Sequence, residues 1–109
     1  MPTQMKPLGQ SAPAAGALTT LYTVPALTEA VGSTIMVCNR SSIATSFRIA
    51  VRPLGASIAD RMYIWYDIPI PGNDTFAATV GFALQSTDIV SVYATLNTLS
   101  FTLFGQEIS

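Results

Sequence analysis

The sequence contains no histidine and only one cysteine, Cys38. Without histidine, the chain cannot form Ser-His-Asp or Cys-His catalytic groups, and it lacks the commonest side-chain ligand of transition metals. One cysteine cannot form a disulfide within the chain, nor can it build a zinc or iron–sulfur site of several thiolates. We therefore expect no catalytic residues, no cofactor and no metal site, and hence a protein that is not an enzyme.

Charge is also scarce. Charged residues make up 10% of the chain, against about 25% in typical soluble domains. The net charge of −1 and the five basic residues do not provide the clustered Lys and Arg that bind nucleic acid, so we expect no such partner. Two interpretations of the neutral surface stay open. Serine and threonine could replace charged residues on a free surface, or other subunits could cover much of it, because interface centres are depleted of charge.

Long hydrophobic runs are missing as well, although half of the residues are hydrophobic. Residues 89–106, the longest late stretch without charge, alternate polar and apolar side chains, which predicts two strands and a turn instead of a membrane-spanning helix. The start of the chain has no continuous apolar segment of the kind that secretory signals contain. We expect no membrane partner.

Residues 1–17 are rich in proline, alanine and glycine, with Pro2, Pro7 and Pro13 among them. Proline opposes regular structure, and little in this stretch could nucleate a core. The composition predicts an extended N-terminal arm, either disordered or ordered against a neighbouring subunit. The remaining residues, 18–109, have the length of a single domain.

Alternation of apolar and polar side chains dominates that domain. Phe47, Ile49 and Val51 alternate with Arg48 and Arg52, which predicts a strand over residues 45–52 with its apolar side chains on one face. A second β-rich run lies just upstream, so residues 33–52 are interpreted as two antiparallel strands joined by a short loop. With this pair, the predicted strands are residues 18–24, 29–39, 45–52, 62–68, 75–80 (continued or bent by 81–84), 89–95 and 99–104.

About seven strands at intervals of some ten residues, with no long helix, are typical of an all-β fold. The pattern predicts an antiparallel β-sandwich or jelly roll. Within the second strand, alternation places Ile35 and Val37 on one face and Thr34, Met36 and Cys38 on the other. Cys38 is expected to be a buried and inert thiol of the same apolar run.

The run at residues 62–68 carries large side chains on both faces. Strict alternation places Tyr63, Trp65 and Asp67 together, opposite Tyr66 and its neighbours. The aromatic side chains could form an exposed contact site between subunits, or they could complete a single core. Asp67 is expected to pair with an arginine, namely Arg48, Arg52 or Arg61.

Carboxylates offer two further chemistries, neither of which the pattern favours. A carboxylate pair could support glycoside hydrolysis, and Asp74 with Asp88 could bind calcium. Both aspartates, however, precede predicted strands in turn-like sequences. We interpret them as turn residues.

Seven short motifs follow one another along the chain: LYTVP (21–25), VCNRS (37–41), FRIAVRP (47–53), YIWYD (63–67), NDTF (73–76), TDIVSVYA (87–94) and LSFTLFGQEI (99–108). In this order and spacing, the chain from about residue 18 to its C-terminus resembles small virion-associated β-sandwich proteins of tailed bacteriophages, including cyanophages. The chain is similar as well to modules within larger phage fibre proteins. The resemblance implies an oligomeric, often trimeric, structural domain in a phage particle, and it carries over no catalytic residues.

These observations lead us to expect a virion protein assembled in the host cytoplasm. The first expectation is a homotrimeric capsid decoration (cement) protein that binds the major capsid protein. A neck, tail or fibre-associated component is the second. A carbohydrate-binding module, in which Tyr63, Trp65 and Tyr66 stack on sugar rings, is the third. For contacts between subunits we predict the aromatic residues Tyr63, Trp65 and Phe104, with Arg48 and Arg52 as polar anchors.

Overall fold

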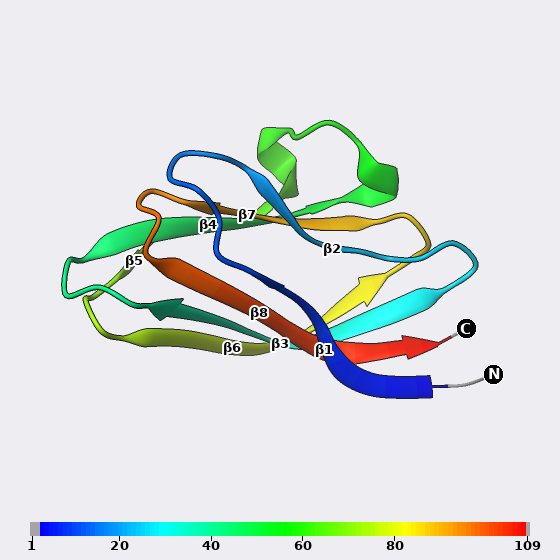
Figure 1. The fold of residues 1–109 in the computed structure, drawn as a ribbon. Helices are drawn as coiled ribbons and strands as arrows, with labels where there is room; N and C mark the ends of the chain where they lie inside the picture. The colour runs from blue at the N-terminus through cyan, green and yellow to red at the C-terminus, as the bar shows by residue number, and fades with distance from the viewer. Residues whose placement is uncertain (1–2, 109) are drawn as a thin grey trace.

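The computed structural model describes residues 3–108, which form eight β-strands and two short 3-10 helices (Figure 1). The elements in chain order are β1 (Thr3–Ser11), β2 (Thr19–Thr23), β3 (Glu29–Asn39), β4 (Thr45–Arg52), η1 (Pro53–Gly55), η2 (Asp60–Met62), β5 (Tyr63–Ile70), β6 (Thr75–Leu84), β7 (Ile89–Ala94) and β8 (Leu99–Ile108).

The strands form two four-stranded antiparallel sheets that pack face to face (Figure 1). One sheet has the order β1-β8-β3-β6 and the other has the order β2-β7-β4-β5. The predicted all-β, sandwich-like architecture is confirmed. The number of strands is eight instead of about seven.

The additional strand is β1, which lies where the sequence predicted an extended arm. It pairs antiparallel with β8 along its length, and Leu8 packs against the core. Pro7 lies at a register shift on this edge strand, where a missing N–H costs no hydrogen bond within the sheet. A β-carbon at Gly9 would lie 2.1 Å from the carbonyl oxygen of Leu21, so a glycine lets β2 pass close to β1. The arm prediction is therefore wrong for Thr3–Ser11, because an edge strand tolerates the proline that suggested irregular structure.

The two strands that we expected to pair within residues 33–52 lie in different sheets. β3 pairs with β6 and β8, whereas β4 pairs with β5 and β7. Residues 40–44 carry the chain across the sandwich. The predicted core face of β4 is nevertheless right, since Phe47 and Ile49 are fully buried. The predicted alternation of β3 is also right, and the face shared by Ile35 and Val37 is the buried one. Alternation identifies a strand's buried face but does not name its hydrogen-bonding partner.

Aromatic rings join the two sheets at the centre of the sandwich. The Phe47 ring of β4 lies 5.1 Å from that of Phe76 and 6.1 Å from that of Phe101, measured between centroids. Trp65 of β5 packs edge-on against Phe76 and Phe82 of β6. Since β4 and β5 belong to one sheet and β6 and β8 to the other, these contacts hold the layers together.

Asn39 forms the main buried polar centre at one end of the sandwich. Its Nδ2 donates to the carbonyl oxygens of Ile43 (2.8 Å) and Pro71 (3.2 Å). Its Oδ1 accepts hydrogen bonds from the Ser41 N–H and the Thr98 hydroxyl, each at 3.1 Å. A single side chain at the end of β3 thereby links three loops.

Lys6, Glu107 and Tyr22 join the sheets at another point. The Lys6 ammonium lies 2.8 Å from Oε1 of Glu107, and the Tyr22 hydroxyl donates to Oε2. These hydrogen bonds, from Lys6 first and then Tyr22, lower the pKa of Glu107 below its ordinary value. Burial, followed by the contact with Glu107, raises the pKa of Tyr22.

The lowered pKa of Glu107 predicts an acid-dependent loss of stability. Its carboxylate is favoured in the folded protein, so its contribution is complete above the unfolded-state pKa of about 4.3 and is lost as the pH falls through the folded-state pKa. We expect the free energy of unfolding, measured in urea from about pH 7 to about pH 2, to fall less steeply in Glu107→Gln than in the wild type. Parallel pH curves for the two proteins would contradict this assignment.

Candidate interaction surfaces

Strand β5 contains two irregularities that change which side chains face outward. Ile49 pairs with Trp65, but Ala50 pairs with Tyr63 and Phe47 pairs with Ile68, so β5 has an extra residue at each step. Each bulge reverses the alternation that strict period-two pairing would give. Trp65 and Ile68 consequently both pack against the core.

The same bulges place Tyr63 and Tyr66 together on the outer face. Their rings lie 5.0 Å apart at 82°, in an edge-to-face arrangement. Tyr66 is 54% exposed, whereas Tyr63 is half-buried. The prediction that Tyr63 and Trp65 share a face is therefore wrong, because the bulge between them turns Tyr63 outward.

Arg48 holds Tyr66 in place from the neighbouring strand β4. Its guanidinium carbon lies 4.2 Å from the Tyr66 ring centroid and 4.4 Å from that of Tyr93, so the cation is stacked between two tyrosines. Its Nε donates to Oδ1 of Asp67 at 2.6 Å, which confirms the predicted pairing of Asp67 with an arginine. The hydrogen bond to Asp67 also raises the pKa of Arg48, so the guanidinium stays charged.

Residues 53–62, which include η1 and η2, cross over part of this outer face (Figure 1). Helix η1 contacts β7, and η2 contacts β4. Arg52 fixes this segment to the sheet, since its guanidinium donates to the carbonyl oxygens of Ala56 (2.7 Å) and Gly55 (3.2 Å). Ala50 and Ser91, which the strand pairing places on the outer face, are fully buried.

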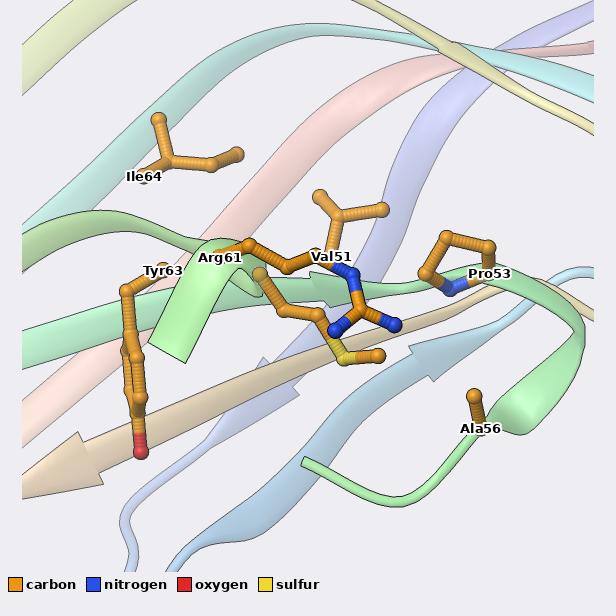
Figure 2. A pocket seen from close by; sticks show the side chains of 7 residues that line it. Val51, Pro53, Ala56, Arg61, Tyr63 and Ile64 are labelled. Atoms are coloured by element: carbon orange, nitrogen blue, oxygen red, sulfur yellow. The ribbon is translucent and has the colours of Figure 1, made fainter. Parts of the chain in front are cut away.

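Two hollows adjoin Tyr63. One, of about 410 Å³, is lined by Pro53, Ala56, Arg61 and Met62 of that segment and by Val51, Tyr63 and Ile64 of the adjoining strands. Figure 2 shows the Arg61 side chain extending across this hollow towards Pro53, with the Tyr63 ring at its other side. The second hollow, of about 420 Å³, is lined by Asp60, Tyr63 and Tyr66.

The opposite sheet presents a different surface, which we call the uncharged face. Three cross-strand rows of outward side chains on β6, β3 and β8 compose it. All of these side chains are exposed or half-buried, and they include Met36 and Phe104, each 37% exposed. None of the nine residues is charged: Thr79, Thr34 and Phe104; Ala77, Met36 and Thr102; Thr75, Cys38 and Ser100.

Comparisons of this chain with family models, with curated proteins and with solved structures find no match. The geometry of the two outer faces is therefore the basis for any functional assignment.

The five residues predicted to contact other subunits lie in three different places. Tyr63 and Arg48 lie on the outer face of the β2-β7-β4-β5 sheet, and Arg52 fixes residues 53–62 to it. Phe104 lies on the uncharged face of the other sheet, and Trp65 packs against the core. They do not form one contact surface, and their role between subunits stays a prediction.

Cys38 differs from its prediction. The thiol is exposed on the uncharged face instead of buried. The run that contains it is apolar on both faces, and only the inner face, with Ile35 and Val37, is covered within the chain. An apolar residue on the outer face of a sheet cannot be distinguished from a core residue by hydropathy alone.

Metal and membrane sites receive no support from the part of the chain that the structure describes. Within residues 3–108, His, Cys, Asp and Glu do not gather in groups of three that could hold a metal ion. Asp88 accepts hydrogen bonds from the Leu54 and Gln85 N–H groups, and Asp74 accepts one from Thr75, in agreement with turn roles. The described segments also include no helix with the length and apolarity needed to cross a bilayer.

Sequence reasoning missed the contact of Tyr93 with Arg48, and it missed that Asp60 and Arg61 line the two hollows at Tyr63. Tyr93 alternates with the buried Val92 and Ala94, which marks it as outward, but only the register of β4 with β7 places it opposite Arg48. Asp60 and Arg61 lie in η2, a single 3-10 turn of three residues.

Proposed function

We propose that this chain is a non-enzymatic structural protein of a phage virion, and within that class a homotrimeric capsid decoration protein whose second partner is the major capsid protein. The proposal rests on the motif order of the sequence, which resembles small virion-associated phage proteins, and on the surface of the folded chain. The uncharged face is the observation that carries it.

The fold is proposed to be a jelly roll. Strand pairs β4–β5, β3–β6, β2–β7 and β1–β8 are those of one long two-stranded antiparallel ribbon that folds over into two layers. The resulting orders, β1-β8-β3-β6 and β2-β7-β4-β5, are the ones that a jelly roll requires. Viral capsid proteins are among the proteins that use this architecture, which supports a structural role in a particle.

The uncharged face shares two features with protein–protein contacts. Interface centres are depleted of charge, and they contain more methionine and aromatic residues than other surfaces. Met36 and Phe104 supply those groups here, between threonine, serine and alanine side chains. Edge strand β6, which carries three residues of this face, has no charged residue over its ten positions. Edge strands that stay free usually carry charges or proline against unwanted pairing.

The size of the chain permits more than one contact. A standard interface buries about 800 Å² on each partner, and the accessible surface of the chain is 5702 Å². A trimer contact and a contact with the capsid can therefore coexist on different surfaces.

A charge placed at the centre of the uncharged face tests the self-association. We expect light scattering to give the mass of a trimer for the wild-type protein and that of a monomer for Met36→Lys, because burying the new ammonium at a contact is costly. Leu27→Lys is the matched control. It introduces the same charge at a 94% exposed leucine outside this face and should remain trimeric. A wild-type monomer, or a trimeric Met36→Lys protein, would refute assembly through this face.

Sedimentation with isolated phage particles tests the location. A decoration protein should sediment with tail-free heads and stay in the supernatant with head-free tails. Binding to tails alone would overturn the capsid assignment in favour of the tail or fibre alternative, without affecting the trimer test.

A further inference from the structure

The two outer faces of the sandwich point in opposite directions, and they differ in chemistry. The uncharged face belongs to the β1-β8-β3-β6 sheet, whereas the tyrosine pair belongs to the other sheet, the two sheets being the two layers of Figure 1. Tyr63 lines both hollows. A subunit that uses the first face for assembly therefore leaves the second accessible to solvent.

The exposed tyrosine on this second face is held in a fixed orientation. Tyr66 lies against the Arg48 guanidinium on one side and the Tyr63 ring on another. The adjoining Asp67 has a φ of 52°, in the left-handed region that non-glycine residues rarely adopt, and its carboxylate is paired with Arg48. Strained residues of this kind occur preferentially at ligand sites, and a bulge is a common device for redirecting a side chain.

Polar groups of both signs border the rings. Asp60 lines the hollow that contains Tyr66, and Arg61 extends across the hollow on the other side of Tyr63 (Figure 2). Among the described residues, neither Asp60 nor Arg61 lies within ion-pair distance of an oppositely charged side chain. Their hydrogen-bonding capacity is available to a ligand, whereas Arg48 and Asp67 already satisfy each other.

We propose that Tyr63, Tyr66, Asp60 and Arg61 form a binding site for a neutral oligosaccharide with at least two sugar rings. The apolar face of a pyranose ring stacks on an aromatic ring, while its hydroxyl groups donate to a carboxylate and accept from a guanidinium. Two hollows of about 410 and 420 Å³ that share Tyr63 can each hold one ring, and both fall within the usual volume range of ligand pockets.

The chemistry of the surface disfavours other ligands. A polyanion would need several unpaired cations, but Arg61 is the only basic residue that lines either hollow. A purely apolar ligand would make no use of Asp60 and Arg61, which line the two hollows. The third aromatic residue once expected at such a site, Trp65, faces the core and does not take part.

The experiment is a screen of the full-length wild-type protein on an array of neutral tri- and tetrasaccharides of hexoses and N-acetylhexosamines, followed by calorimetric titration with the best-retained one. We expect a Kd below about 1 mM, and we expect Tyr66→Ala and Asp60→Asn each to weaken it by about tenfold or more. Leu27→Ala is the control. It truncates a 94% exposed side chain that lines neither hollow, so binding should change less than about threefold.

Two results would overturn the site. The first is an array on which no saccharide binds with a Kd below about 1 mM. The second is binding that Tyr66→Ala and Asp60→Asn leave unchanged, or that Leu27→Ala weakens as much as they do. Circular dichroism of each variant verifies its fold. Because none of these substitutions lies on the uncharged face, the trimer test is independent of either result.

Discussion

Replacing Phe47 by alanine should lower the free energy of unfolding by about 3–5 kcal/mol. Phe47 is fully buried, and its ring contacts Phe76 and Phe101 of the opposite sheet. The substitution removes both aromatic contacts and leaves a cavity that the strands of two sheets cannot close without distortion. Urea unfolding followed by circular dichroism measures the loss.

Phe104→Ala provides the matched control, because it makes the same change on the outer face of β8. Phe104 is 37% exposed and is not part of the core cluster, so we expect its loss to change the free energy of unfolding of the monomer by less than about 0.5 kcal/mol. Equal effects of the two substitutions would show that the inner and outer faces have been assigned wrongly. Both substitutions should be measured in the Met36→Lys protein, which is expected to be a monomer, so that the free energy of unfolding contains no contribution from assembly.

Replacing Asn39 by leucine should cost about 2–4 kcal/mol. Leucine has a similar volume, so the effect isolates the hydrogen bonds. The substitution leaves two carbonyl oxygens, of Ile43 and Pro71, and the Ser41 N–H without their side-chain partner. Because these groups lie in separate loops, we also expect faster amide hydrogen exchange in residues 40–44 and 71–74.

Asn97→Leu is the control for this prediction. Asn97 is an exposed turn residue whose backbone carbonyl, and not its side chain, accepts a hydrogen bond from Arg40. The same substitution there should change the free energy of unfolding by less than about 0.5 kcal/mol. A loss at Asn39 no larger than that at Asn97 would mean that water satisfies the loop groups, and the network would then have no structural role.

The fold class could be predicted because it depends on local alternation. Alternation groups Phe47 with Ile49 on one strand face and Ile35 with Val37 on another. Both faces are buried in the structure. The strand partners could not be predicted in this way. β3 and β4 are adjacent in sequence but lie in different sheets, because their apolar faces meet across the core.

The candidate sites were harder to predict from the sequence than the fold class. Strict alternation puts Tyr63 with Trp65, whereas two bulges in β5 separate them and bring Tyr63 to Tyr66. Bulges leave little trace in a strand without glycine, and residues 63–70 contain none. The pairing of Asp67 with an arginine was predictable from charge, but the choice of Arg48 depends on the register of β4 with β5.

Alkylation of Cys38 is the most direct measurement of the central claim, that copies of this chain cover the uncharged face. Cys38 is the sole cysteine, and its thiol is exposed on that face in the single chain. The rate should be about tenfold slower in the trimer than in the Met36→Lys monomer, and it should rise as the wild-type protein is diluted and dissociates. An alkylation rate that is the same in both proteins and independent of concentration would contradict assembly through this face.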